Sequence, residues 1–345
     1  MLSFKNILVV RTDRIGDVVL TTPVFKALRE HFPDTKISVL VAKSNVDLVK
    51  GNPYVDQIFY DDRRQEHKGI FGFWRLVAQI RKQKFDAVLN FHTKKRTNLL
   101  CFLAGIPERF GYRNNKFGTL LNRPIKDERH LGRKHETQYC LDVLKELGIE
   151  NAEPVLFLPI EEESAQWVGQ VLGEKNTIGQ KVFVFNPGAS DSSRCWPWER
   201  FAELMTCLEK KYSARMVLVG GKAERPLGEK IIGQAAFPVI NLIGKTSVAQ
   251  LVALLKKCDL LVSNDSGPVH VASAVATPVV SIITRNQPGI NPERWKPLGS
   301  KSTYISVPPD SRPVFLKAGQ ADPKYLELIP VSEVLQAVDS IFKLC

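Results

Sequence analysis

A short polar turn at residues 262–270, VSNDSGPVH, combines residue types that suit phosphate binding. Apolar residues stop at Val262, and four polar residues lead into Gly267 and an expected helix that holds His270. A helix N-terminus offers unpaired N–H groups and the positive end of a dipole, and small residues let a phosphate approach it. His270 lies four positions after Ser266, on the same helix face. The turn predicts a phosphate or sugar-phosphate site, with an ordinary N-cap by Asp265 or Ser266 as the alternative.

A second polar loop lies in FNPGASDSSRCWPWERF (185–201), after an Asn-Pro-Gly turn. Its polar residues include Ser190, Ser192, Ser193 and Arg194. The guanidinium of Arg194 can donate two hydrogen bonds to one phosphate, and Pro197 suits the first position of the next helix. The alternative is a flexible polar loop with no ligand.

Two further loops carry the residue types of a nucleotide site. VGGKAER (219–225) places Glu224 where its carboxylate can accept a hydrogen bond from a ribose hydroxyl, and LIGKTS (242–247) can offer backbone atoms to an adenine ring. Each segment alone also fits a plain strand-to-helix turn. Because all four loops follow expected strands, together they predict a site for a nucleoside diphosphate.

Two carboxylates lie close together in RTDRIGD, which follows the apolar run NILVV. Gly16 permits a tight turn, and Asp17 then falls in the first turn of a helix, where the dipole stabilises its anion. An ionised carboxylate can accept the proton of an attacking hydroxyl, so we predict that Asp17 is a general base. The alternative is a helix-start Asp without a chemical role. Asp13 competes for the same role, but its place between Arg11 and Arg14 predicts an ion pair with one of them.

Basic side chains gather in the first half of the chain. The segments are NFHTKKRTN (90–98), ERFGYR (108–113) and DDRRQEHK (61–68). They predict binding of a phosphate-rich acceptor, with Lys94, Arg96 and Arg113 as candidate ligands. A solvated basic surface is the alternative.

Short apolar runs that alternate with amphipathic stretches must position these loops. The expected strands are 6–10, 36–42, 55–60, 85–91, 181–186, 214–221, 238–244, 259–263 and 278–283, and the expected helices are 17–32, 73–83, 198–212, 224–235, 247–258 (with Ser247 as N-cap), 267–275 and 329–344. Strands that are apolar throughout and alternate with helices predict two α/β, Rossmann-like domains with parallel sheets, which we place at residues 1–165 and 166–345. In such sheets ligands bind beyond the carboxyl ends of the strands, where the polar loops lie.

The composition limits the class of protein. The 345 residues carry a formal net charge of +12, which favours anionic partners or serves solubility alone. Six cysteines form no CxxC pair and no metal spacing, so we expect reduced thiols. We also expect no signal peptide, no membrane span and no metal cofactor, because the sequence has no long apolar run and no DxD carboxylate pair. No GxGxxG follows either first strand, which argues against a dinucleotide oxidoreductase.

Four segments carry a family resemblance that extends from about residue 5 to 285. They are ILVVRTDRIGDVVLTTPVFKALREHFPDTKISVLV, NPGASDSSRCWPWERFAEL, LIGKTSVAQLVALLKKCDLLVSNDSGPVHVASAV and PVVSI. The chain resembles the ADP-heptose:lipopolysaccharide heptosyltransferases of glycosyltransferase family 9. The resemblance implies a GT-B fold, in which an acceptor-binding and an ADP-sugar-binding Rossmann-like domain face each other across a cleft.

The resemblance also implies a reaction and its residues. Heptose would pass from ADP-L-glycero-β-D-manno-heptose to a lipopolysaccharide core acceptor with inversion, in one displacement and without a metal. Asp17 matches the catalytic base of the family. The implied donor ligands are Ser190, Arg194, Glu224, Thr246, Asp265, Ser266, Gly267 and His270. Many members have Lys where this chain has Arg194.

From these features we expect a monomer at the cytoplasmic face of the inner membrane. Its partners would be the nucleotide-sugar donor and an anionic lipopolysaccharide precursor, with peripheral membrane contact and no nucleic acid. Two alternatives remain: a relative that uses another nucleotide sugar, and a non-catalytic glycolipid- or nucleotide-binding protein of the same fold. Asp17 together with the complete turn at 265–270 argues against the second.

Overall fold

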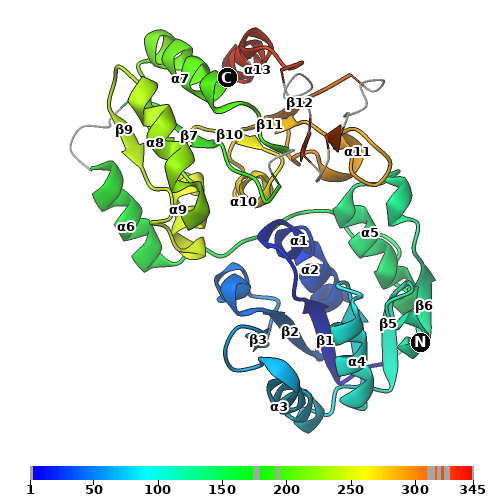
Figure 1. Cartoon of the computed structure of the whole chain (residues 1–345). Coiled ribbons are helices and arrows are strands. Elements are labelled where there is room, and N and C mark those ends of the chain that lie inside the picture. The colour runs from blue at the N-terminus through cyan, green and yellow to red at the C-terminus, as the bar shows by residue number, and fades with distance from the viewer. Residues whose placement is uncertain are drawn as a thin grey trace. The chain divides into compact units, whose positions relative to one another are not determined.

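The structure is a computed structural model that describes residues 3–173, 179–191, 194–308, 315–316, 320–321 and 327–343. The chain divides into two compact units, residues 1–159 and 160–345 (Figure 1). We refer to them as unit 1 and unit 2. The division falls six residues before the boundary that the sequence suggested. Each unit is an α/β layer structure around one six-stranded sheet, as expected.

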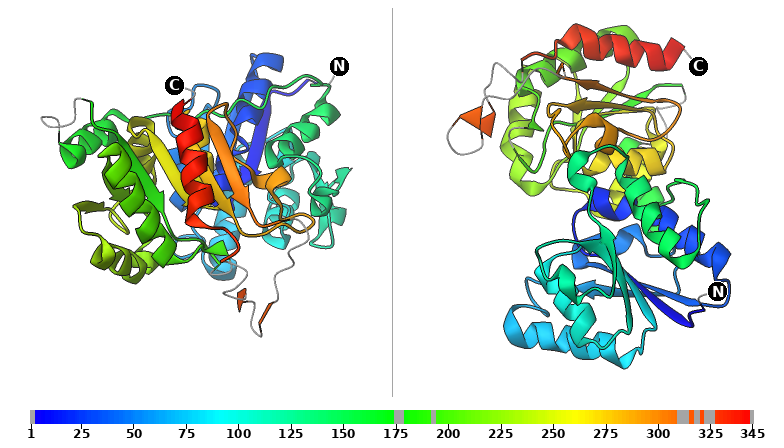
Figure 2. Two further views of the ribbon diagram at one scale, coloured as in Figure 1. Left: turned by 90° about the horizontal axis from the view of Figure 1, so that it is seen from above. Right: turned by 90° about the vertical axis from the view of Figure 1, so that its right-hand side faces the viewer.

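Unit 1 contains a parallel sheet in the order β3-β2-β1-β4-β5-β6. Its strands are β1 (Asn6–Arg11), β2 (Lys36–Ala42), β3 (Gln57–Asp61), β4 (Ala87–Asn90), β5 (Glu108–Arg113) and β6 (Arg123–Lys126). Its helices are α1 (Ile15–Val19), α2 (Thr22–His31), α3 (Gly69–Lys82), α4 (Lys95–Leu103) and α5 (Glu136–Asp142), with 3-10 turns η1 (Lys43–Leu48), η2 (Gly118–Leu120), η3 (Arg129–Leu131) and η4 (Val143–Leu147). Helices α3 and α4 pack together over one face of the sheet (Figure 2). Leu8 and Val10 of the sheet and Leu76 and Leu100 of the helices belong to one buried cluster there.

Unit 2 repeats this strand order as β12-β11-β10-β7-β8-β9, again with all pairs parallel. The strands are β7 (Val182–Asn186), β8 (Arg215–Leu218), β9 (Val239–Asn241), β10 (Leu260–Asn264), β11 (Val279–Ile283) and β12 (Ser302–Ser306), and a separate hairpin holds β13 (Phe315–Leu316) and β14 (Gln320–Ala321). The helices are α6 (Glu162–Leu172), α7 (Trp198–Tyr212), α8 (Arg225–Gln234), α9 (Val248–Lys257), α10 (Gly267–Ala274), α11 (Pro292–Trp295) and α13 (Val331–Lys343), with the 3-10 turn η6 (Lys222–Glu224). Helix α7 packs against α8 and α13, and α9 packs against α6 and α10.

In each sheet the first and fourth strands of the unit are neighbours. These pairs are β1 with β4 and β7 with β10. From the two strands of each pair the chain continues to strands on opposite sides of the sheet, so the strand order reverses between them. Open α/β sheets bind ligands at this reversal point, beyond the carboxyl ends of the strands. The loops after these four strands are therefore the places to look for chemistry.

Two sequence expectations are corrected by the structure. The single helix expected at 17–32 is two helices, α1 and α2, because Pro23 has no N–H for the carbonyl of Val19. The hydroxyl of Thr22 donates to that carbonyl instead, at 2.7 Å. Pro197 is the N-cap of α7 rather than its first residue. The expected N-cap at Ser247 is confirmed, since its Oγ accepts from the N–H of Gln250 at 3.1 Å.

Candidate functional site

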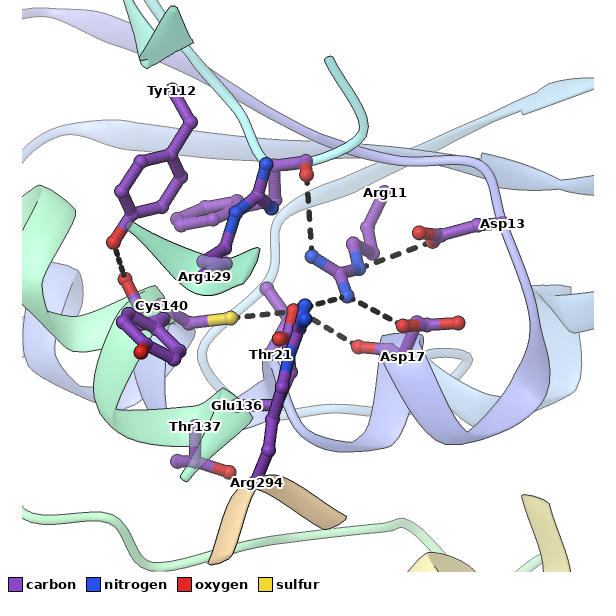
Figure 3. A network of polar contacts seen from close by, with 12 residues as sticks. Arg11, Asp13, Asp17, Thr21, Tyr112, Arg129, Glu136, Thr137, Cys140 and Arg294 are labelled. Carbon is purple, nitrogen blue, oxygen red and sulfur yellow. Dashed lines mark hydrogen bonds and ion pairs between the residues drawn. The ribbon is translucent and has the colours of Figure 1, made fainter. Parts of the chain in front are cut away.

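In unit 1, three carboxylates converge on one buried arginine at the carboxyl end of β1 (Figure 3). Arg11 Nη2 lies 2.8 Å from Oδ1 of Asp17 and 2.9 Å from Oε1 of Glu136, and its Nε lies 3.1 Å from Oδ1 of Asp13. Nη1 donates to the carbonyl of Phe91, 3.3 Å away, which follows β4. The guanidinium thus joins the neighbouring strands β1 and β4 to the helices α1 and α5.

Asp17 is the third residue of α1, and its side chain is held by Arg11 more than by the dipole of that helix. Helix α1 has five residues, so its dipole is small, and Gly16 lies inside it rather than in a left-handed turn. The tight-turn argument for Gly16 and the dipole argument for Asp17 are therefore replaced by an ion pair. The side chain of Asp17 is 17% exposed, which leaves it partly accessible to a ligand.

Asp13 pairs with Arg11, one of the two partners that the sequence suggested, while Arg14 is exposed. Desolvation raises the pKa of Asp13 to about 7, against the opposing pull of Arg11, and the charge of Asp17 adds to the rise. Because it is buried, Asp13 takes up a proton far more readily than an ordinary aspartate, although it lies beside the guanidinium of Arg11.

Glu136 is the member of this cluster that the sequence analysis missed. It is buried at the first position of α5, and α5 is fixed by Tyr112, whose hydroxyl donates to the carbonyl of Tyr139 at 2.6 Å. The residues three and four positions after Glu136, Tyr139 and Cys140, are buried as well. This spacing on one helix face is the signal that could have marked Glu136 as buried.

A second series of hydrogen-bonded side chains runs along the same sheet edge from β3 to β4. Arg63 donates to Asp61 at 2.8 Å and to the hydroxyl of Thr12 at 3.2 Å, and Thr12 contacts Nδ1 of His92 at 2.9 Å. Desolvation and the nearby cations, Arg11 first, lower the pKa of His92 to about 3. His92 is therefore a neutral hydrogen-bonding group at physiological pH.

The three predicted acceptor ligands have different surroundings. Arg96 binds both oxygens of the buried Asp61, at 2.8 and 2.9 Å, and stacks over the ring of Phe73. Its guanidinium is thus already occupied by a structural partner. Lys94 and Arg113 are exposed, Lys94 at the N-cap of α4 and Arg113 at the end of the adjacent strand β5.

In unit 2, an amide side chain ties the loops after β7 and β10 together. Nδ2 of the buried Asn186 lies 2.9 Å from Oγ of Ser266 and 3.1 Å from Oγ of Ser263. Ser266 stands at the N-cap position of α10, but its side chain makes no capping hydrogen bond. Pro268 has no N–H and the N–H of Val269 donates to the carbonyl of Ser266 at 3.1 Å, so the first turn of α10 can offer an anion the N–H of Gly267.

Arg194 lies beside this helix start. Its Nη1 is 3.6 Å from Oδ2 of Asp265, and its backbone N–H donates to the carbonyl of Asp191 at 2.9 Å. The guanidinium is 20% exposed and Asp265 is 8% exposed, so the carboxylate orients a partly accessible cation. Ser192 and Ser193, which the sequence placed in the same loop, lie outside the described residues.

Glu224 fits a cradle of three glycines from the loops after β7 and β8. Its carboxylate accepts from the N–H of Gly221. A Cβ on Gly188 would lie 2.5 Å from Cδ of Glu224, and one on Gly220 would lie 2.9 Å from its Oε2. No larger residue fits at Gly188 while Glu224 stays in place, so the glycines hold this carboxylate at the sheet edge.

The remaining predicted donor ligands lie near these groups or on the next loop. His270 is buried in α10, with its ring centroid 6.2 Å from that of Trp295. Ser190 is exposed in the loop after β7, and Thr246 is half-buried in the loop after β9. Unit 2 thus brings Arg194, Asp265, Ser266, Gly267 and His270 to the reversal point of its sheet, with Glu224 on the neighbouring loop.

Within the described ranges, no group of three or more His, Cys, Asp and Glu side chains is arranged to hold a metal ion. Five cysteines are free thiols there: Cys101, Cys140, Cys195, Cys207 and Cys258. Among the helices that the structure describes, none has the length and apolarity needed to cross a bilayer.

The chain is similar to a known protein family and to several of its members. The family described as glycosyltransferase family 9 (heptosyltransferase) matches residues 73–324. The chain is 28% identical over 311 residues to the lipopolysaccharide core heptosyltransferase OpsX of Haemophilus influenzae, covering 88% of this chain and 84% of that protein. It is 26% identical over 344 residues to lipopolysaccharide heptosyltransferase 3 of Escherichia coli K12, covering 94% and 95%.

Solved structures establish the fold. A glycosyltransferase family 9 protein from Veillonella parvula superimposes with a TM-score of 0.88 at 24% identity and covers 100% of this chain and 99% of its own. The Escherichia coli ADP-heptose lipopolysaccharide heptosyltransferase II superimposes with a TM-score of 0.77 at 22% identity, covering 98% and 99%.

Proposed function

Because the chain belongs to glycosyltransferase family 9, and is therefore a glycosyltransferase, we propose that it transfers heptose from an ADP-heptose donor to a lipopolysaccharide core acceptor. Relatives named as lipopolysaccharide heptosyltransferases match 88% and 94% of the chain, and they support heptose as the transferred sugar and lipopolysaccharide as the acceptor. We assign the acceptor to unit 1 and the donor to unit 2, and we place the enzyme at the cytoplasmic face of the inner membrane.

Asp17 acts as the general base in this proposal, and its ion pair with Arg11 is the observation that carries it. Arg11 Nη2 binds Oδ1 at 2.8 Å, which orients the carboxylate, and we assign Oδ2 to the acceptor proton. Asp13 also pairs with Arg11, and desolvation raises its pKa to about 7, so it is the second candidate.

The transfer is one displacement. As Asp17 takes the proton of the acceptor hydroxyl, the hydroxyl oxygen forms a bond to the anomeric carbon from the face opposite the diphosphate. The bond from that carbon to the phosphate oxygen breaks, and ADP leaves with the electron pair, so the anomeric configuration inverts. Arg194 and the backbone N–H of Gly267, at the start of α10, stabilise the negative charge that grows on the diphosphate. Glu224 accepts from the ribose.

The test compares Asp17→Asn with Asp13→Asn as its matched control, because both residues pair with Arg11. Transfer of heptose to the acceptor is followed by mass spectrometry, and ADP binding by calorimetry. We expect Asp17→Asn to lose about 10²–10⁴-fold in kcat with unchanged ADP affinity, and Asp13→Asn to keep most of its activity. Near-normal turnover by Asp17→Asn would refute the assignment. A panel of ADP-, UDP- and GDP-linked sugars tests the donor separately.

A further inference from the structure

The first two turns of α3 present three large apolar side chains to solvent. Ile70 is 66% exposed, Phe71 86% and Trp74 49%. They lie within five positions of one another on the outer side of the helix, while Leu76 and Ile80 of the inner side pack into the core of unit 1. We call Ile70, Phe71 and Trp74 the apolar patch. Clustered exposure of this size marks a contact surface rather than an ordinary soluble face.

Cations are frequent in the segment that carries the apolar patch. The segment 61–84 contains seven Lys and Arg against three Asp and Glu. Two of those acids are buried and already paired, Asp61 with Arg96 and Asp62 with Lys43. Six exposed cations of the segment have no ion pair within the described part of the chain: Arg64, Lys68, Arg75, Arg81, Lys82 and Lys84. We call these six residues the basic rim.

The wider charge distribution has the same sign. Residues 1–159 contain 27 Lys and Arg and 18 Asp and Glu, an excess of nine positive charges. Nine of the +12 charges of the whole chain thus belong to the unit that carries the apolar patch. A surface with this charge attracts an anionic partner over about a Debye length, or about 8 Å at physiological salt.

The apolar patch is joined to the candidate base site by one short loop. Residues 62–68 lead from the carboxyl end of β3 to α3, and Arg63 of this loop donates to Thr12, next to Asp13. The loop packs tightly on α3, because a Cβ on Gly72 would lie 2.5 Å from the backbone of His67. The patch therefore lies at the same edge of the unit 1 sheet as the Arg11 cluster.

We propose that the apolar patch and the basic rim dock unit 1 on an anionic lipid surface. Phe71 and Ile70 insert at the boundary between headgroups and acyl chains, Trp74 lies at headgroup level, and the rim cations bind lipid phosphates. Exposed apolar side chains on the first turns of a helix, in a segment rich in exposed cations, fit this chemistry better than a protein partner. The proposal deepens the proposed function, because it would bring the base site beside a lipid-linked acceptor.

The experiment is vesicle co-sedimentation of the full chain without donor or acceptor, so its failure is separate from that of the proposed function. Phosphatidylcholine vesicles are compared with vesicles that also contain phosphatidylglycerol. We expect binding to the anionic vesicles that weakens with salt. The double variant Phe71→Ser/Trp74→Ser should lose at least tenfold in partition coefficient, and Arg75→Gln or Lys82→Gln about fivefold each.

Tyr304→Ser is the matched control, because Tyr304 is an exposed aromatic of unit 2, and it should bind like the parent chain. Melting curves check that each variant is folded. Three results would overturn the proposal: no binding to anionic vesicles, equal binding by the double variant, or a self-association in analytical centrifugation that the double variant abolishes while vesicle binding persists.

Discussion

Replacing Arg11 by methionine should destabilise unit 1 more than any other single charge removal in its candidate site. The guanidinium is 2% exposed and contacts Asp13, Asp17 and Glu136 within 3.1 Å. Its removal takes away the guanidinium that the three carboxylates share, and Glu136 is itself only 2% exposed. Methionine fills a similar volume, so the effect reports the lost charge rather than a cavity.

The expected size follows from the burial of the pairs. Removing one partner of a buried ion pair costs about 3–5 kcal/mol, because the other charge stays desolvated and unpaired. For a unit of this size, about 2–4 °C accompany each kcal/mol, so its melting temperature should fall by roughly 6–20 °C. Differential scanning calorimetry of the full chain measures this.

Acid should relieve the defect. The carboxylates repel one another only while they are ionised, so the difference between parent and Arg11→Met should shrink as the pH falls towards 4. Arg29→Met is the control, because Arg29 and Asp56 form an ion pair near the surface, for which about 0–1 kcal/mol is expected. If Arg11→Met loses no more than Arg29→Met, or its loss does not depend on pH, the role given to Arg11 is wrong.

Three further predictions follow from the sites. The pKa of Asp13 is about 7 in the folded protein against an ordinary 3.8, so the folded state binds this proton more tightly and the free energy of unfolding falls as pH rises from about 4 to 7. Asp13→Asn should remove this contribution to the pH dependence of stability, which denaturant titrations at several pH values measure. The pKa of His92 is lowered, to about 3 against an ordinary 6.5, so its effect on stability runs the other way and the free energy of unfolding falls as pH drops below about 6.5. His92→Gln should therefore lose less stability in acid than the parent chain. Gly188→Ala should displace Glu224 and weaken ADP binding about tenfold in calorimetry, whereas Gly233→Ala, whose Cβ meets open space, should not; equal affinities would contradict the glycine cradle.

The elements with strong local signals were predictable from the sequence. The amphipathic stretch at 198–212 is helix α7 with the same limits, and the cap at Ser247 begins α9. The strand β5 was not predicted as a strand, because ERFGYR has charged residues at both ends. In the sequence, only the alternate apolar residues Phe110 and Tyr112 indicate that this strand is buried.

The sequence predicted the site residues that lie in polar loops after strands. It did not predict those whose role depends on a contact with a residue far away in the sequence. Asp17 and the turn at 265–270 stand out because small and acidic residues follow apolar strands. Glu136 has no such local context, and its burial results from Arg11, 125 positions earlier in the chain. Arg96 was grouped with ligand-binding cations because the sequence does not show that the buried Asp61 already binds it.

The distance between Arg11 and Glu136 along the chain has a consequence for synthesis. At translation rates of about 5–20 residues per second, Glu136 is made about 6–25 s after Arg11. During that interval β1 and β4 can pair while Arg11 has only Asp13 and Asp17 beside it. The last carboxylate arrives with α5, the final helix of unit 1, so the growing chain completes the base site only when the whole unit has left the ribosome.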